Sequence, residues 1–272
     1  MNTQPVAVAD QDTRSAPNAN AAAVDHKGAT MNRIAAVTKL HFVNPWTVLA
    51  VPAMILVLIL LMNITIWWLI LSNIDSAADR ADARDGFSYS GASLFIFVYM
   101  MVVAVQAMNL TFPFALGYGV TRREFYLGSA AAFVILSAIW AVTLTVLASI
   151  ETATGGWGLG GRMFSAVYFG TGQWYQQLFL FFAWFVFFFF VGAAVAALYV
   201  RWKTNGLLAF FAALAVLLVG GLAIIIRTDS WGSVGQWFAE TGTYGLAAWS
   251  LVPAVLSALA GYVILQRATP KG

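Results

Sequence analysis

Residues 46–71 read WTVLAVPAMILVLILLMNITIWWLIL and contain no charged side chain. As a helix this stretch would be about 39 Å long, enough to cross the roughly 30 Å hydrocarbon core of a bilayer. An amphipathic helix of a soluble protein interrupts its apolar positions at every turn, and this stretch does not. It therefore predicts a transmembrane helix.

The rest of the chain has the same character. Of its 272 residues, 61% are hydrophobic and only 9% are charged, whereas an ordinary soluble domain has about 25% charged residues. Further apolar runs predict five more spans, at residues 92–116, 125–150, 177–200, 207–226 and 246–265. Cysteine is absent, which excludes disulfides, thiolate metal sites and cysteine nucleophiles. We expect an all-α integral membrane protein with six transmembrane helices.

Two segments precede the first predicted span. Residues 1–30 are rich in Ala, Asn, Asp and Thr without a periodic apolar pattern, so we expect a disordered cytoplasmic tail before one membrane domain at residues 31–272. Residues 31–43 (MNRIAAVTKLHFV) carry an apolar stripe at helical spacing opposite Arg33 and Lys39. This pattern predicts an amphipathic elbow helix at the membrane interface. The alternative is a frayed first turn of the following span.

The basic residues predict the orientation in the membrane. If the N-terminus is cytoplasmic, that side holds 10 of the 14 basic and 4 of the 11 acidic residues, a net charge of +6, and the outer side has a net charge of −3. The basic residues assigned to the cytoplasm are Arg14, Lys27, Arg33, Lys39, Arg122, Arg123, Arg201, Lys203, Arg267 and Lys271. Because cytoplasmic loops favour lysine and arginine, both termini are predicted inside a multi-pass protein of the plasma membrane.

The chain lacks the residues that several kinds of membrane-protein chemistry require. No charged residue lies well inside a predicted span, and both histidines, His26 and His41, precede the first one. Proton-coupled carriers and intramembrane metalloenzymes need ionisable groups at depth, so these classes are disfavoured. The glycine-rich run 155–161 (GGWGLGG) has no lysine, and no G-x-x-x-x-G-K-[ST] motif occurs, so the chain should not hydrolyse ATP. We expect no enzyme activity, no cofactor, no metal and, since the basic residues are scattered, no nucleic-acid partner.

The connection between the second and third predicted spans is the most informative segment. Residues 112–129 read FPFALGYGVTRREFYLGS, in which Thr121 and Glu124 have the spacing of a capping box. Arg122 and Arg123 would then project into the cytoplasm beside Phe125. This arrangement fits a docking surface for a partner protein. Equally, two arginines at the start of a helix can simply satisfy the positive-inside bias.

This segment resembles the first intracellular loop of ABC-2 type transporter permeases. In that family a Pro-Phe-Ala-Leu-like run precedes a glycine, a small hydroxyl residue, paired basic residues and an aromatic residue. The matching residues are Pro113, Phe114, Ala115, Leu116, Gly119, Thr121, Arg122, Arg123 and Phe125. The likeness extends over about residues 31–272, in the elbow, the six spans, the cytoplasmic termini and a short helical excursion before the last span.

The resemblance implies a function for the loop. In the family, this loop is a coupling helix that inserts into a cleft of a separate ATPase subunit, which binds the ATP. The corresponding residues here are Thr121, Arg122, Arg123, Glu124 and Phe125. The chain would then be a permease subunit of an exporter, acting as a homodimer or heterodimer. The alternatives are a non-transporting membrane anchor or immunity-type protein, and a secondary carrier.

Other polar and aromatic residues are candidates of lower specificity. Gln106 and Asn109 could line a translocation path, although interhelical packing also accounts for polar residues within spans. Trp231, Trp237 and Phe238 could form an outer gate of short re-entrant helices, as in similar permeases, or an interfacial loop with aromatic anchors.

Two adjoining stretches of the fourth predicted span have contrasting side chains. The run 179–190 (FLFFAWFVFFFF) is bulky on every side and predicts a lipid-facing surface. The small residues that follow it, 192–197 (GAAVAA), predict close helix packing.

Overall fold

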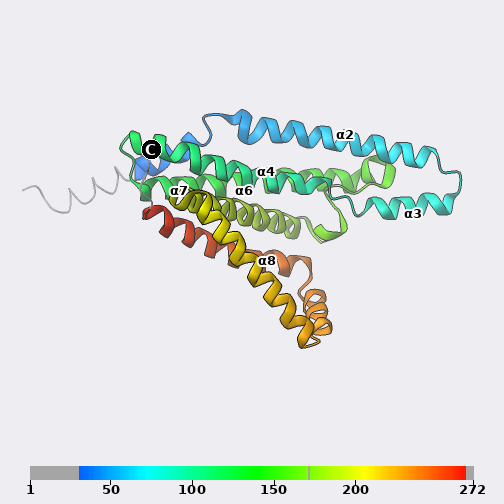
Figure 1. Ribbon diagram of the computed structural model, residues 1–272. Coiled ribbons are helices and arrows are strands. Elements are labelled where there is room, and N and C mark those ends of the chain that lie inside the picture. Colours follow the sequence, from blue (N-terminus) through cyan, green and yellow to red (C-terminus); the bar gives the residue numbers. More distant parts are fainter. Residues whose placement is uncertain (1–30, 171, 268–272) are drawn as a thin grey trace, which may run out of the picture.

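The computed structural model describes residues 31–170 and 172–267, and every regular element within them is a helix (Figure 1). The predicted disordered tail at residues 1–30 lies outside the described residues. Residues 31–40 form the first described helix. The later elements are η1 (Trp46–Ala50), α2 (Val51–Ser72), α3 (Ala77–Phe87), η2 (Ala92–Leu94), α4 (Phe95–Gln106), η3 (Ala107–Thr111), α5 (Phe112–Gly117), α6 (Arg122–Ala153), η4 (Gly156–Gly160), η5 (Val167–Phe169), α7 (Trp174–Arg227) and α8 (Trp231–Gln266).

Within residues 31–170 and 172–267, five helical stretches are long and apolar enough to cross a membrane. They are Trp46–Ser72, Ala77–Gly117, Arg122–Ala153, Trp174–Arg227 and Trp231–Gln266. Together they contain the residues of all six runs predicted as spans. The all-helical fold predicted from the sequence is therefore confirmed, and the length and apolar composition of these helices suggest a membrane protein.

The fourth of these stretches, α7, is too long for one crossing. Its 54 residues would extend about 81 Å as a straight helix, far more than the roughly 30 Å of a hydrocarbon core. The backbone leaves helical geometry at Lys203, which has φ 55° and ψ −149°. The predicted runs 177–200 and 207–226 lie on either side of this residue. In Figure 1, α7 packs along α4 and α6 before the break and diverges from them after it.

The core lies where α4, α6 and the first half of α7 meet. The ring of Phe97 on α4 lies 4.6 Å from that of Phe185 on α7, and Phe133 on α6 stacks 5.1 Å from Phe189. Phe181, Phe185 and Phe189 are completely buried. The predicted lipid-facing surface at residues 179–190 is thus wrong for this face, because a helix that is apolar all round gives no signal that distinguishes lipid from a neighbouring helix.

Small residues allow a close contact between α4 and α7 in this core. A Cβ on Gly192 would lie 2.6 Å from the carbonyl oxygen of Met101, so α4 and α7 can approach this closely only at glycine. Ala193, Ala196 and Ala197, which follow on α7, are fully buried. The predicted close packing at residues 192–197 is confirmed.

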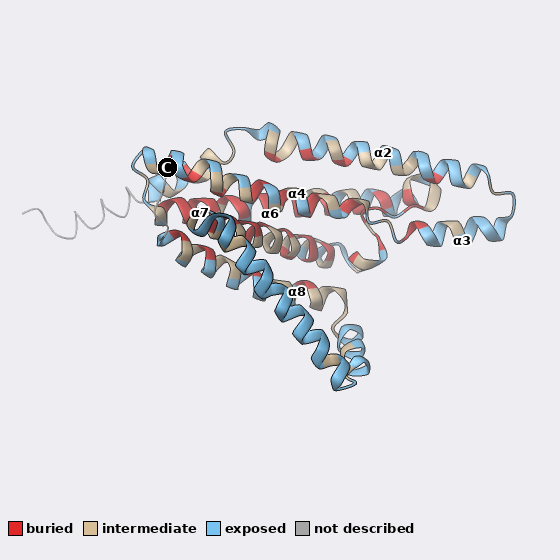
Figure 2. Ribbon diagram, viewed as in Figure 1, coloured by how far each residue is buried: buried red, intermediate tan, exposed pale blue. Residues whose placement is uncertain are grey.

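The segment of α7 beyond Lys203 has a different environment. Residues 208–224 are all exposed, and Figure 2 shows this stretch in pale blue while α4 and α6 carry most of the buried positions. After the turn at residues 228–230 the chain returns as α8, whose final turns lie against α6. The helix at residues 31–40 and the end of α8 consequently lie at the same end of the bundle (Figure 1).

Candidate functional site

The loop before α6 is held by the capping box that the sequence predicts. The hydroxyl oxygen of Thr121 accepts a hydrogen bond from the backbone N–H of Glu124 at 3.2 Å, and Oε2 of Glu124 accepts one from the backbone N–H of Thr121 at 2.9 Å. Two N–H groups that a helix start leaves without partners are thereby satisfied. The prediction is confirmed, and the direction in which the chain enters α6 is fixed.

Glu124 also contacts the first described helix. It is buried, and Nη1 of Arg33 lies 3.9 Å from its Oε1. Four residues further along α6, the carbonyl of Gly128 accepts a hydrogen bond from the Thr38 hydroxyl at 3.0 Å. A Cβ on Gly128 would lie 2.6 Å from Cβ of Val37, so this close approach requires glycine. The helix at residues 31–40 is therefore clamped onto the beginning of α6.

His41 completes this contact just after the helix ends. Its Nε2 lies 3.0 Å from the hydroxyl of Ser129, and its ring packs near Phe125 and Phe133, at centroid distances of 6.3 Å and 5.8 Å. Burial lowers the pKa of His41 from 6.5 to about 4, because the apolar surroundings disfavour the imidazolium. The ring is therefore neutral at physiological pH and is part of the packing.

Phe125 cannot be the docking anchor that the sequence suggested. Its side chain has no exposed surface, and its ring lies 5.2 Å from that of Phe112 on α5. The physical reason lies in the cap: Phe125 is the fourth residue after Thr121, the position at which a hydrophobic staple turns inward. Glu124, likewise buried, has the same internal role. Both residues shape the loop without being available to a partner.

The two arginines of the loop have different environments. Nη1 of Arg122 donates a hydrogen bond at 2.8 Å to the carbonyl of Gln266, the last residue of α8. A cation at a helix C-terminus is favourable, so this contact ties α8 to the start of α6. Tyr126 adds a second tie, since its hydroxyl donates to the carbonyl of Ala258 at 2.6 Å. Arg123 is exposed and makes no ion pair with any of the described residues.

The exposed part of the loop differs from the predicted set. Thr121 and Arg123 are exposed, and Tyr118 is 77% exposed. The ring of Tyr118 lies 4.8 Å from that of Phe114. We call Tyr118, Thr121 and Arg123 the loop patch. Tyr118 was not among the predicted site residues, although an aromatic residue between two glycines, in a loop predicted to be cytoplasmic, is a signal that could have identified it.

The predicted translocation residues do not share one environment. Gln106 ends α4 and is exposed, whereas Asn109 lies within the π-helical segment η3 and is half-buried. The Oδ1 atom of Asn109 is buried and accepts no hydrogen bond from the part of the chain that the structure describes. π-helical turns often mark functional positions, which keeps Asn109 as the candidate of interest.

The predicted gate residues lie on the first part of α8. Trp231, Trp237 and Phe238 are each about half exposed, and Trp237 packs near Phe238 and Trp249 at ring distances of 5.0 Å and 6.1 Å. The backbone breaks at Gly242, with φ 61°. This segment is therefore a short helix followed by a break, before the longer part of α8.

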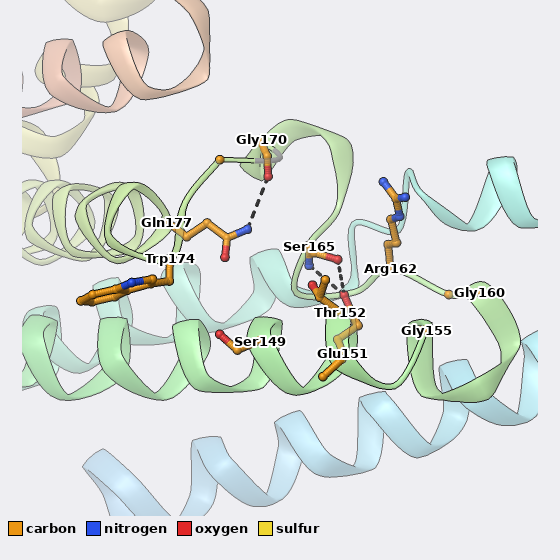
Figure 3. Close-up of a pocket in the computed structure, with 14 residues that line it drawn as sticks. Ser149, Glu151, Thr152, Gly155, Gly160, Arg162, Ser165, Gly170, Trp174 and Gln177 are labelled. Carbon is orange, nitrogen blue, oxygen red and sulfur yellow. Dashed lines mark hydrogen bonds between the residues drawn. The ribbon is translucent and has the colours of Figure 1, made fainter.

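A cavity of about 730 Å³ lies at the other end of α6 (Figure 3). Its walls come from the end of α6, loop residues between 155 and 170, Gly172 and the beginning of α7. The loop is organised by Glu151, which is completely buried. Its Oε1 accepts from the backbone N–H and the hydroxyl of Ser165, at 2.8 Å and 2.7 Å, and its Oε2 accepts from the N–H of Met163 and from Nε1 of Trp157, both at 2.9 Å.

All partners of Glu151 are donors, as a carboxylate requires. This role was not predicted, because a single acidic residue at the end of an apolar helix resembles an ordinary charge on the outer side. No cluster of His, Cys, Asp or Glu that could hold a metal ion occurs at residues 31–170 or 172–267.

Comparison with protein-family models, with curated proteins and with solved structures finds no match to this chain.

Proposed function

We propose that this chain is the membrane-spanning subunit of an ATP-driven exporter of the ABC-2 type, energised by a separate ATPase that docks on the loop patch. The observation that carries the proposal is the construction of the loop. It exposes Tyr118 and Arg123, while the capping box of Thr121 and Glu124 holds its backbone. A short aromatic and cationic surface on a stiff support fits a contact that must transmit force.

The connections of the loop supply a route for that force. The start of α6 is joined to the helix at residues 31–40 through Gly128 and to the end of α8 through Arg122. A displacement of the loop patch would therefore move three helices together as one body. Such rigid-body movements are a common form of coupling between a membrane domain and an attached protein.

The proposed topology has six crossings with both termini in the cytoplasm. The length of α7 and its break at Lys203 support a division of this helix into two crossings that meet at a cytoplasmic turn. Lys203 and Arg201 then lie on the side that the positive-inside rule favours, together with the loop patch. The elbow helix at residues 31–40 would lie along the same cytoplasmic surface, in the plasma membrane.

The experiment is co-purification with a P-loop ATPase encoded beside this chain. Arg123→Glu should reduce the recovered ATPase at least tenfold, because the loop would then repel its partner or lose an anchor. Lys39→Glu is the matched control, since Lys39 is exposed on the same predicted side and undergoes the same change of charge. Equal recovery with both variants would contradict the docking site.

The readout of function is solute-stimulated ATP hydrolysis by the assembled complex. Stimulation that is lost with Arg123→Glu and kept with Lys39→Glu supports a transporter. An ATPase that binds through the loop patch without any transport would indicate the alternative, a membrane anchor.

A further inference from the structure

Two of the long apolar stretches contain the same irregularity, a π-helical segment followed by a proline. The segment η1 ends two residues before Pro52, and η3 ends two residues before Pro113. A proline has no N–H, and its ring clashes with the carbonyl four residues before it, so the hydrogen bonding of the helix is interrupted there. Both stretches are therefore weakened at the same position relative to their prolines.

At Pro52 the interruption is closed by side chains from two other helices. The hydroxyl of Tyr99 on α4 donates to the carbonyl of Thr47 at 2.9 Å. Nε1 of Trp140 on α6 donates to the carbonyl of Val48 at 3.1 Å. These two carbonyls lie five and four residues before Pro52, so they are the ones to which the proline cannot donate. The segment η1 is consequently fixed to α4 and α6.

At Pro113 the interruption is not closed in this way. Whereas Pro52 is buried, Pro113 is exposed, and the carbonyls five and four residues before it belong to Met108 and Asn109. The long-range hydrogen bonds that side chains of the described residues donate to backbone carbonyls reach other positions. No side chain of residues 31–170 or 172–267 therefore ties these two carbonyls to a neighbouring helix.

The side chain of Asn109 adds an unpaired acceptor at the same place. Its Oδ1 is buried and accepts no hydrogen bond from the described residues. A buried oxygen without a donor raises the free energy of the conformation that contains it. A rotation about η3 that brings this oxygen to a donor would remove that cost, so the described conformation has a competitor.

The segment η3 joins two parts of the chain that pack on different helices. Before it, the ring of Phe97 on α4 lies 4.6 Å from that of Phe185 on α7. After it, the ring of Phe112 on α5 lies 5.2 Å from that of Phe125 at the start of α6. A movement of the loop patch relative to α4 would have to be absorbed between Phe97 and Phe112, where η3 is the weakened part of the helix.

We propose that η3 is a hinge between α4 and α5, whereas the equivalent segment η1 is locked by Tyr99 and Trp140. Prolines and π-helical turns are the usual places at which helices bend, and hinges are short segments at the ends of elements. The hinge belongs to the chain by itself. It is measured without an ATPase, so its failure and the failure of the proposed docking are separate results.

The test compares two pairs of spin labels in the purified chain, reconstituted in lipid nanodiscs. Because the chain has no cysteine, nitroxides attach only at introduced cysteines. The pairs are Val98→Cys with Phe114→Cys, across η3, and Trp46→Cys with Met62→Cys, across η1. All four side chains are exposed, and both pairs have the same separation in sequence, about 24 Å along a straight helix. Double electron–electron resonance should give a distance distribution roughly twice as wide across η3 as across η1.

Substitutions at the two prolines and at the locking side chains test the cause. Pro113→Ala supplies the missing N–H and should narrow the η3 distribution to the width of the η1 distribution. Pro52→Ala is the matched control and should leave the η1 distribution unchanged, because its carbonyls are already paired. Tyr99→Phe combined with Trp140→Phe removes both locking donors and should widen the η1 distribution roughly twofold.

Equal widths of the two distributions in the otherwise unaltered chain would overturn the hinge, as would an η3 distribution that Pro113→Ala does not narrow. A folded Tyr99→Phe, Trp140→Phe protein that keeps the narrow η1 distribution would overturn the lock. If that double variant does not fold, the comparison of the two pairs and Pro113→Ala still decide whether η3 is a hinge.

Discussion

Two carboxylates on α6 have the same local role at opposite ends of the helix. Glu124 accepts a hydrogen bond from the N–H of Thr121 at the start, and Glu151 accepts several from residues 163–165 near the end. In each case a carboxylate receives backbone N–H groups that have no partner in a ladder. Both ends of α6 are consequently stiff, which places the loop patch and the cavity on defined supports.

Replacing Glu151 by glutamine should destabilise the fold strongly. The glutamine amide would turn an N–H donor towards groups that are themselves donors, and the charge-assisted hydrogen bonds would be lost. We expect the free energy of unfolding to fall by about 3 kcal/mol. Glu240→Gln is the control, since the exposed Glu240 accepts a hydrogen bond from Gln236 alone among the described residues, and its replacement should change stability by less than about 0.5 kcal/mol. Equal thermal shifts for the two variants would contradict this role.

Substitutions of Phe125 and Tyr118 by alanine distinguish residues that pack the loop from residues that dock a partner. Phe125→Ala removes a fully buried ring and should cost about 3–5 kcal/mol of stability. Tyr118→Ala removes an exposed ring and should leave stability nearly unchanged while weakening the ATPase complex by about 1–3 kcal/mol. Detergent-melting curves and co-purification measure the two effects. A stable Phe125→Ala protein would show that the ring is not part of the core.

At the scale of elements, the helix at residues 31–40 and α6 form one unit that should respond to pH. His41 is half-buried, and desolvation lowers its pKa to about 4, against 6.5 for an exposed histidine. Below pH 6.5 the His41 imidazole binds a proton in the unfolded chain but not in the folded chain, so the free energy of unfolding falls as the pH falls from 6.5 towards 4. Between pH 7.5 and 4.5 the loss from this residue should be about 2.5 kcal/mol.

The measurement compares the wild-type chain with His41→Gln. Glutamine can still reach Ser129 with a hydrogen bond and does not titrate, so the difference between the two unfolding profiles isolates the histidine. The wild-type profile should be the steeper one below pH 6.5. Profiles that run parallel over the whole range would show that His41 is accessible to protons in the folded state.

The sequence predicted the elements better than it predicted their surroundings. Apolar runs located the helices because a stretch such as 46–71 has no other plausible solvent than lipid, and the spacing of Thr121 and Glu124 identified the cap because that motif is local. By contrast, uniform apolarity could not show which face of residues 179–190 meets α4. The hydrogen bonds of Glu151 were also not predicted, because their donors are brought near the carboxylate only by the folded loop.

The connection at residues 201–206 illustrates the same limit. Its basic residues predicted a cytoplasmic loop, but the backbone departs from helical values only at Lys203. A single non-helical residue is enough to redirect α7, and the polar composition of residues 201–206 does not show which residue leaves helical geometry. The exposure of Tyr118 and the burial of Phe125 were likewise not predicted, because both depend on how the capped turn is oriented.

At the scale of the whole molecule, the proposed orientation can be tested directly because the chain has no cysteine. Cysteines introduced at Ser76 and Ser233, which are exposed on the predicted outer side, should react with an impermeant thiol reagent in intact cells. One at Thr204, beside the break in α7, should react only after the membrane is opened. Labelling of Thr204→Cys from outside would contradict six crossings with cytoplasmic termini.

The whole-molecule account depends most on contact between the loop patch and an ATPase. The most direct measurement is photo-crosslinking in cells from an unnatural amino acid at Tyr118, with the same residue at Tyr175 as a control that is similarly exposed at the other end of the bundle. The account predicts a crosslink from position 118 to a P-loop ATPase, and none from position 175. Crosslinks from position 118 to lipid alone, with no ATPase captured, would contradict it.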